Sequence, residues 1–228
     1  ADHMGLGKTL TTLSLVSINK AKPDFLNKEE DLIPIKGTLL VCPSQLCKQW
    51  QGEIKKNFPY MKVSLILTKT HHVKISYQDI IESDIVIVSY QFLINFSYYP
   101  SLNYQKTTPA MVNCSNRASI LANKLKKLKE ENKKDDVIDY SKLKAPMFEH
   151  FHWHRLVMDE AHEIFGQMLQ NKSQNHYICD WILRLNYVNR WFVSGTPFVN
   201  KFGYNSCLKF LEHQCFYKDI LVDTNTRS

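Results

Sequence analysis

The chain begins with Ala1-Asp2-His3-Met4-Gly5-Leu6-Gly7-Lys8-Thr9, and the rest of the fold is organised around this stretch. Gly5 and Gly7 allow the backbone to curl so that successive N–H groups face a polyphosphate. In such a loop Lys8 reaches the β- and γ-phosphates, and Thr9 offers its hydroxyl to Mg²⁺. The spacing therefore predicts a phosphate-binding loop that leads into a helix, whose positive end faces the same anion.

This loop matches the phosphate-loop pattern incompletely. The pattern G-x-x-x-x-G-K-[ST] requires a glycine five residues before Gly7, where Asp2 stands. A short G-K-T sequence also occurs in ordinary glycine turns, so both interpretations stay open on the loop alone. Residues 8 to about 19 favour the phosphate loop, because apolar residues recur there at the spacing of a helix packed on a sheet. These residues are Leu10, Leu13, Val16 and Ile18.

Composition limits the class of protein. The 228 residues, 44% of them hydrophobic, suffice for one large α/β domain with a sizeable core. No apolar run approaches the roughly 18 residues of a membrane span, and we read no signal peptide before the loop. The six cysteines are scattered without C-x-x-C pairs, which indicates reduced, buried thiols. We therefore expect a soluble intracellular protein that does not bind membranes.

The net charge of +7 is concentrated in one segment. Residues 115–134 contain seven lysines and arginines but only two glutamates, while the remaining chain is nearly balanced. The total charge is therefore weak evidence for a nucleic-acid-binding surface on the core domain.

Short apolar runs alternate with helical segments along the chain. The runs are residues 37–42, 62–67, 84–89, 155–158 and 190–193. Nearly continuous apolar runs are typical of strands buried on both faces of a parallel sheet. Helices are predicted at residues 45–58 with Ser44 as N-cap, near 76–82, around 177–185 and at 205–216, and a surface loop at 21–36. The alternation favours an α/β fold with a doubly wound, mostly parallel sheet.

The alternation stops between about residues 92 and 151, which is too long for an ordinary connection and indicates an insertion. Within it Leu121, Leu125 and Leu128 share one face of a predicted amphipathic helix, followed by a charged, mobile stretch to residue 144. The helix is either a solvated element at the domain edge or an arm that binds DNA or a partner. Because the segment has few large apolar residues, we expect the domain to remain folded when residues 115–144 are deleted.

Two polar stretches follow predicted strands in the second half of the chain. One is Asp159-Glu160-Ala161-His162 and the other is Ser194-Gly195-Thr196-Pro197. Ligands of open α/β sheets bind where strands end. Beside a phosphate loop, Asp159 can hold Mg²⁺ through a water, and Glu160 can deprotonate the water that attacks the γ-phosphate. Alone, D-E-A-H is also compatible with an acidic helix start. The interpretation therefore depends on the order along the chain of the phosphate loop, residues 43–50, D-E-A-H and S-G-T-P.

That order resembles the first RecA-like lobe of a superfamily-two helicase, specifically the Snf-type helicase-like ATPases of chromatin remodelling and DNA repair. The resemblance covers nearly the whole chain, residues 1–228, outside the insertion. Motif I resembles residues 2–9, motif Ia 43–50, motif Ib 88–90, motif II 159–162, and motif III 194–197 with Asn200. The departures from the family pattern are His3, Phe165-Gly166 and Phe198-Val199, none of which is a phosphate or metal ligand.

The resemblance implies a set of site residues. The catalytic residues it implies are Glu160, Asp159 and Lys8, with Mg²⁺ held by Thr9 and Asp159. The implied ATP-binding residues are Asp2, Met4, Gly5, Leu6, Gly7, Lys8, Thr9 and Leu10. The residues implied to couple hydrolysis to movement are His162, Ser194, Gly195 and Thr196. The residues expected to contact the DNA backbone are Ser44, Gln45, Ser89 and Tyr90, because they follow parallel strands at the same edge of the sheet.

The resemblance further implies an ATP-driven translocase on double-stranded DNA, with chromatin or repair proteins as partners. It would work in the nucleus, or for a large DNA virus in the host cell or virion. A second RecA-like lobe in cis, absent from these residues, would supply an arginine, so we expect little ATPase activity from this chain alone. Two alternatives stay open: a DEAH-type RNA helicase lobe, and a truncated, non-catalytic module that binds nucleotide or DNA.

Two groups of potential metal ligands lack a convincing zinc spacing. His150, His152 and His154 alternate along an extended segment, and Cys207, His213 and Cys215 lie near one another. We expect both groups to be packing or surface residues.

Overall fold

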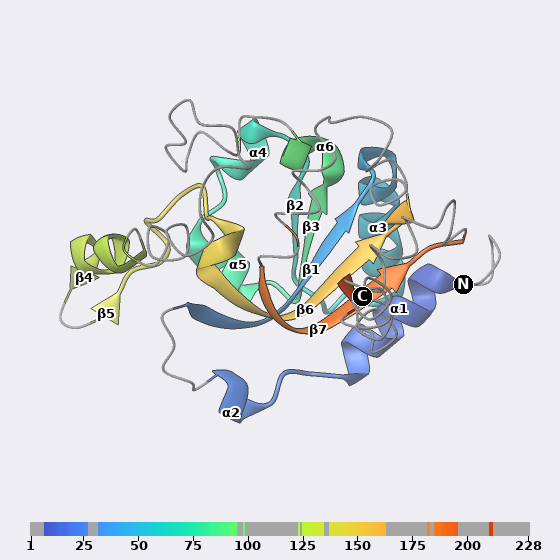
Figure 1. Cartoon of the computed structure of the whole chain (residues 1–228), viewed down its shortest axis with the longest axis horizontal. Helices are drawn as coiled ribbons and strands as arrows, with labels where there is room; N and C mark the ends of the chain where they lie inside the picture. The colour runs from blue at the N-terminus through green and yellow to red at the C-terminus, as the bar shows by residue number, and fades with distance from the viewer. Residues whose placement is uncertain are drawn as a thin grey trace, which may run out of the picture.

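The structure is a computed structural model that describes residues 7–26, 32–94, 98, 123, 125–134, 137–162, 182, 185–195 and 210–211. Five strands form one sheet in the order β2-β3-β1-β6-β7, and each neighbouring pair is parallel (Figure 1). They are β1 (Ile33–Cys42), β2 (Val63–Ile66), β3 (Ile85–Ser89), β6 (Phe151–Asp159) and β7 (Asn186–Val193). The predicted parallel α/β fold is confirmed.

Helices cover both faces of this sheet. In Figure 1, α1 (Lys8–Ile18) and α3 (Ser44–Asn57) lie on one side, and α5 (Tyr77–Glu82) lies on the other. The shorter elements are α2 (Pro23–Leu26), α4 (Lys69–His72), α6 (Tyr90–Ile94), the 3₁₀ turn Phe148–His150, and an antiparallel pair of β4 (Lys133–Lys134) and β5 (Val137–Ile138). None of the described helices is long and apolar enough to cross a membrane.

Side chains of each strand alternate between two cores, because successive strand residues point to opposite faces. On the α5 side, Leu39 and Val41 of β1 join a large core rich in aromatic residues. Leu40 and Cys42 face the other way, into a smaller core with the apolar residues of α1 and α3. That smaller core includes Leu13, Val16, Trp50, Ile54, Ile85, Ile87 and Val157. The continuous apolar runs are therefore explained by burial on both faces.

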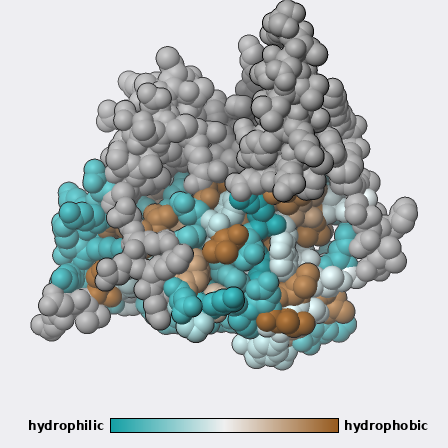
Figure 2. All heavy atoms as spheres, turned by 60° about the horizontal axis from the view of Figure 1, so that its bottom comes forward, coloured by the Kyte–Doolittle hydropathy of each residue, from teal (hydrophilic) through white to brown (hydrophobic). Residues whose placement is uncertain are grey.

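Two predictions near the start of the chain need correction. In α1 only Leu13 and Val16 are buried as predicted, whereas Leu10 and Ile18 are 47% and 80% exposed. Figure 2 shows one face of the molecule, on which hydrophobic side chains form separate small patches among hydrophilic ones. Residues 21–36 are not all loop, because β1 already starts at Ile33, and Ile33 and Ile35 are buried. Apolar spacing identifies the helix but does not say how wide a face the neighbouring elements cover.

The described part of the insertion packs on the main core, which counts against the expectation that the domain remains folded when residues 115–144 are deleted. Residues 125–131 are helical, and Leu125 is fully buried in the larger core, with Leu128 packed against it. Residues 137–150 are tied to α5, since the Tyr77 N–H donates to the Leu143 carbonyl at 2.9 Å. Leu121 lies outside the described residues. So do most of the helices predicted at 177–185 and 205–216, of which Ile182, Leu185 and Phe210 are described and buried.

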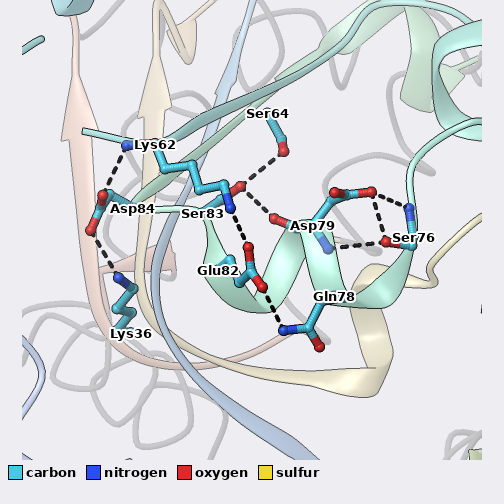
Figure 3. A network of polar contacts seen from close by, with 9 residues as sticks. All are labelled: Lys36, Lys62, Ser64, Ser76, Gln78, Asp79, Glu82, Ser83 and Asp84. Atoms are coloured by element: carbon cyan, nitrogen blue, oxygen red, sulfur yellow. Dashed lines mark hydrogen bonds and ion pairs between the residues drawn. The ribbon is translucent and has the colours of Figure 1, made fainter. Parts of the chain in front are cut away.

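A polar network surrounds the amino-terminal ends of β2 and β3 (Figure 3). It begins at α5, where Ser76 and Asp79 form a capping box. Near the end of α5 the Ser83 hydroxyl donates to the Asp79 carbonyl, and Lys62 pairs with Glu82. Gly37 of β1 approaches this region closely, because a Cβ there would lie 2.9 Å from the Ser83 carbonyl oxygen. We call these contacts the amino-edge network; they hold α5 against the sheet.

Candidate nucleotide site

The predicted site residues follow strands whose carboxyl ends meet at one edge of the parallel sheet, where open α/β sheets bind ligands. Asp159 ends β6, Ser194 and Gly195 follow β7, Ser44 and Gln45 open α3 after β1, and Ser89 and Tyr90 join β3 to α6. The start of α1 belongs to the same edge, since the charge of Lys8 acts on the Asp159 carboxylate. Asp2, Met4, Gly5, Leu6 and Thr196 lie outside the described residues.

The start of α1 has the backbone form that a phosphate loop requires. Gly7 has φ 77°, a left-handed conformation that glycine adopts without strain, and its carbonyl accepts the Thr11 N–H at 2.9 Å. The first turn contains no acidic residue, and in the described part of the chain no side chain caps its N–H groups. Lys8 and Thr9 follow directly. This end of α1 is therefore positive, as the binding of an anion requires.

Asp159 is held by two N–H donors. Its Oδ2 accepts the ring N–H of Trp50 at 2.7 Å, and its Oδ1 accepts the Glu160 backbone N–H at 3.0 Å. The side chain is only 6% exposed, and this burial raises the pKa of Asp159, which the Trp50 N–H opposes. The sequence analysis placed Trp50 at an apolar position of the predicted helix 45–58 and at the end of motif Ia, but gave it no contact with Asp159. The contact could have been anticipated from chemistry, because the ring N–H of a buried tryptophan needs a hydrogen-bond acceptor.

The backbone of Asp159 is held from the other core. The Tyr90 hydroxyl donates to the Asp159 carbonyl at 2.7 Å, and Tyr90 is almost completely buried. Asp159 therefore receives its side-chain donor from α3 and its main-chain donor from α6, on opposite faces of the sheet. Such contacts fix both the carboxylate and the peptide that follows it.

Glu160 and His162 connect the ends of β6 and β7. Glu160 has φ 48°, a left-handed conformation that costs a non-glycine residue about 1–3 kcal/mol. Nδ1 of His162 lies 2.7 Å from the Ser194 hydroxyl and 3.2 Å from a Glu160 carboxylate oxygen. The predicted coupling residues His162 and Ser194 are thus brought together, and His162 also contacts the predicted general base, Glu160.

The residues expected to contact DNA separate into two pairs. Gln45 is exposed, and Ser44 is partly exposed and donates from both its N–H and its hydroxyl to the amide oxygen of Gln91. Ser44 is the first residue of α3 and not its N-cap, a position held by Pro43. Ser89 is buried, and its hydroxyl donates to the Leu67 carbonyl. The Tyr90 hydroxyl is bonded to Asp159, and both the Ser89 and the Tyr90 side chains are buried, which counts against side-chain contacts with DNA; DNA contact at these two residues stays a prediction.

Arg155 is a buried residue that the sequence prediction assigned no role. Its guanidinium donates to the Asn19 carbonyl at 2.6 Å and to the Thr38 hydroxyl at 3.0 Å, and it stacks 4.5 Å from the Trp191 ring centre. Burial lowers its pKa to about 10. A cation suits the carbonyl end of a helix, so Arg155 ties the end of α1 to β6. A charged residue inside an apolar run was the available signal.

The group His150, His152 and His154 makes packing and hydrogen-bond contacts within the domain. Nδ1 of His150 lies 2.7 Å from the Tyr77 hydroxyl, and Nε2 of His154 lies 3.2 Å from the Asn19 carbonyl oxygen. Cys42 and Cys47 are buried free thiols, as predicted. No three His, Cys, Asp or Glu side chains within the described ranges are arranged to hold a metal ion. Cys207, His213 and Cys215 lie outside those ranges.

The donor set at the carboxyl edge fits Mg²⁺ bound together with a polyphosphate. An ionised carboxylate has about four lone-pair sites, and the N–H groups of Trp50 and Glu160 occupy two of those on Asp159. Carboxylate and hydroxyl oxygens, here of Asp159 and Thr9, are ligands that Mg²⁺ accepts, directly or through water. Lys8 adds the positive charge that a polyphosphate requires.

Comparison with known proteins agrees with this geometry. The SNF2-related domain family matches residues 1–221. "Uncharacterized ATP-dependent helicase IRC20" of Saccharomyces cerevisiae is 27% identical over 96% of this chain, and "DNA repair protein RAD5" of Yarrowia lipolytica is 28% identical over 92%. The chain spans only 13% and 16% of the length of these two relatives.

A solved structure, the Sulfolobus solfataricus SWI2/SNF2 ATPase core in complex with dsDNA, aligns with a TM-score of 0.46 and 22% identity. The alignment covers 94% of this chain and 31% of that chain. Since the family match extends over nearly all 228 residues, the chain belongs to the SNF2-related domain family.

Proposed function

We propose that this chain is the nucleotide-binding lobe of a DNA-dependent ATPase that moves along double-stranded DNA. The observation that carries the proposal is the convergence of the start of α1, the Asp159–Glu160 pair and the His162–Ser194 contact at one sheet edge. A positive helix start, a metal-binding acid and a second acid beside it are the parts that hydrolysis of a nucleoside triphosphate needs. Names of relatives such as "DNA repair protein RAD5" support DNA as the partner.

Each residue has a distinct role in this proposal. The N–H groups at the start of α1 and the Lys8 ammonium bind the phosphates. Thr9 and Asp159 hold Mg²⁺, which when bound neutralises charge on the β- and γ-phosphate oxygens. Glu160 orients the attacking water and takes its proton. His162 and Ser194 transmit structural changes at Glu160 to the end of β7, because His162 contacts both Glu160 and Ser194.

A second RecA-like lobe in cis completes the site by supplying an arginine to the γ-phosphate. Without that arginine, related phosphoryl-transfer enzymes lose about 10³–10⁵ in rate. The test is therefore made on the full-length protein: ATP turnover is measured with double-stranded DNA, single-stranded DNA and RNA. We expect the strongest stimulation from double-stranded DNA and nearly complete loss in Lys8→Ala. Preferential stimulation by RNA would contradict the proposal.

DNA contacts of this lobe come from Ser44 and Gln45 at the start of α3. Backbone N–H groups and small polar side chains at a helix start bind phosphates without reading bases, which suits movement along any sequence. We expect Ser44→Ala with Gln45→Ala to reduce DNA stimulation. Lys126→Glu with Lys127→Glu, on the surface of the insertion, serves as the control and should leave stimulation intact. The reverse result would make the insertion the DNA-binding element. The proposed location is the nucleus or, for a protein of a large DNA virus, the host cell or the virion.

A further inference from the structure

Trp50 and Asp159 lie 109 residues apart in the sequence and are joined by a hydrogen bond of 2.7 Å. We propose that Trp50 is a positioning residue for the metal site: its ring N–H holds the Asp159 carboxylate in the orientation that binds Mg²⁺ with the nucleotide. This inference rests on the proposed function, because it concerns the same site.

The packing of Trp50 makes its N–H a fixed donor. Trp50 is 2% exposed and lies in the smaller core between α1, α3 and the sheet, beside Leu13, Cys47 and Ile54. A ring enclosed in this way cannot turn without displacing its neighbours, since protein cores are close-packed. Residues that orient a metal ligand through a hydrogen bond act in this manner.

The two donors to Asp159 are not equivalent. The Glu160 N–H belongs to the next residue, so it moves with the backbone that carries the carboxylate. Trp50 belongs to α3, so its N–H holds the carboxylate in place relative to a different element of the fold. Without it, the carboxylate keeps one adjacent donor and gains rotational freedom, which metal binding must then remove. About two lone-pair sites remain for metal-bound water with Trp50 in place and about three without it, so the number of free sites does not limit metal binding in either case.

A purely structural role for Trp50 makes a different prediction, and the chain contains a matched control. Trp153 is also a fully buried indole, and its N–H donates to the Phe148 carbonyl at 3.0 Å. It lies near the start of β6, six residues before Asp159, which corresponds to about 20 Å along a strand. Trp50→Phe and Trp153→Phe therefore remove the same group from similar surroundings, but only the first affects the carboxylate.

The experiment uses the full-length protein and both variants. Mn²⁺ serves as the metal probe, and its binding in the presence of ATP is measured by electron paramagnetic resonance. Binding of a fluorescent ATP analogue is measured in EDTA and in Mg²⁺. For Trp50→Phe we expect metal affinity to fall about 10–100-fold, the range typical for loss of a group that supports a metal ligand. Nucleotide binding in EDTA should not change, and excess Mg²⁺ should restore most of kcat. For Trp153→Phe we expect no change in metal affinity, even if its melting temperature falls.

A second substitution covers the case in which Trp50→Phe does not fold. Incorporation of 3-benzothienylalanine at position 50 replaces only the ring N–H by sulfur and keeps the shape of the ring. Weakened Mn²⁺ binding in this protein supports the proposal. Wild-type affinity for Mn²⁺ in the folded variant overturns it, while the proposed function stands. A wild-type protein that binds neither Mn²⁺ with ATP nor the analogue overturns the proposed function and this inference with it.

Discussion

The two edges of the sheet both carry acidic side chains, but they are held by different partners. At the amino edge the acids pair with exposed lysines: Asp84 lies 3.3 Å from Lys36, and Glu82 contacts Lys62 (Figure 3). At the carboxyl edge Asp159 is buried, and its carboxylate accepts hydrogen bonds from the neutral N–H groups of Trp50 and Glu160.

This difference indicates that the acids of the amino edge stabilise the fold, whereas Asp159 at the carboxyl edge is available to bind a ligand. Exposed ion pairs contribute only about 0–1 kcal/mol to stability and satisfy their own charges. A buried carboxylate held by neutral donors keeps its negative charge for a ligand, at a cost in stability. Changes at the carboxyl edge should therefore alter chemistry more than folding, and changes at the amino edge should alter folding alone.

The largest expected effect compares two glutamates. Glu160→Gln should lower ATP turnover of the full-length protein by about 10²–10⁴-fold, because it removes the proposed general base, while ATP remains bound. Glu82→Gln at the amino edge should leave turnover unchanged. Lys8→Ala should instead weaken nucleotide binding, which equilibrium titration would measure. If Glu160→Gln and Lys8→Ala reduce ATP affinity equally, the role of Glu160 is wrong.

The next effect concerns the insertion, which supports α5 on the aromatic face of the sheet. Leu125→Ala should lower the free energy of unfolding by about 2–5 kcal/mol, the usual cost of truncating a buried leucine. Deletion of residues 115–144 should be more harmful still, contrary to the expectation from sequence. Lys127→Ala on the exposed side of the same helix is the control. Urea unfolding of the chain measures each change, and a stable deletion variant would show that Leu125 contributes little to the core.

A smaller effect distinguishes two buried tyrosines. Tyr90→Phe removes the donor to the Asp159 carbonyl, and Tyr77→Phe removes a hydroxyl beside His150. Each should cost about 1–3 kcal/mol, because a buried polar partner loses its hydrogen bond. Only Tyr90→Phe should also lower kcat, since it loosens the peptide between Asp159 and Glu160. Equal kcat values in the two variants would confine the role of Tyr90 to stability.

The smallest effect tests the amino-edge network by pH. Hydrogen bonds from the Ser76 N–H and hydroxyl lower the pKa of Asp79. Its contribution to stability is therefore present above the pKa of the unfolded chain and is lost as the pH falls through the lower folded pKa. Asp79→Asn should remove about 0.3–1 kcal/mol at neutral pH, as for other acids at a helix start. The stability of the variant should also depend less on pH below 4, and Asp24→Asn on α2 is the control.

The sequence by itself determined the strands and the residues at their ends. Apolar runs such as residues 84–89 and 155–158 are local patterns, and strands of a parallel sheet end at a common edge. For that reason Lys8, Asp159, Glu160 and Ser194 could be assigned to one site without coordinates. The helix near residues 76–82 was also predicted, and its capping box of Ser76 and Asp79 is a local signal, three residues apart, that the sequence analysis did not use.

Only the tertiary structure decided which partners these residues meet. Trp50 and Tyr90 are amphipathic side chains whose polar atoms can face solvent, DNA or the interior. The positions of these residues in the sequence do not distinguish the three arrangements. The structure turns both toward Asp159, 109 and 69 residues away. It likewise buries Leu125 and exposes Leu10 and Ile18, although all three fit an amphipathic pattern. Periodicity records that a helix has an apolar face, whereas burial depends on what the rest of the chain brings to that face.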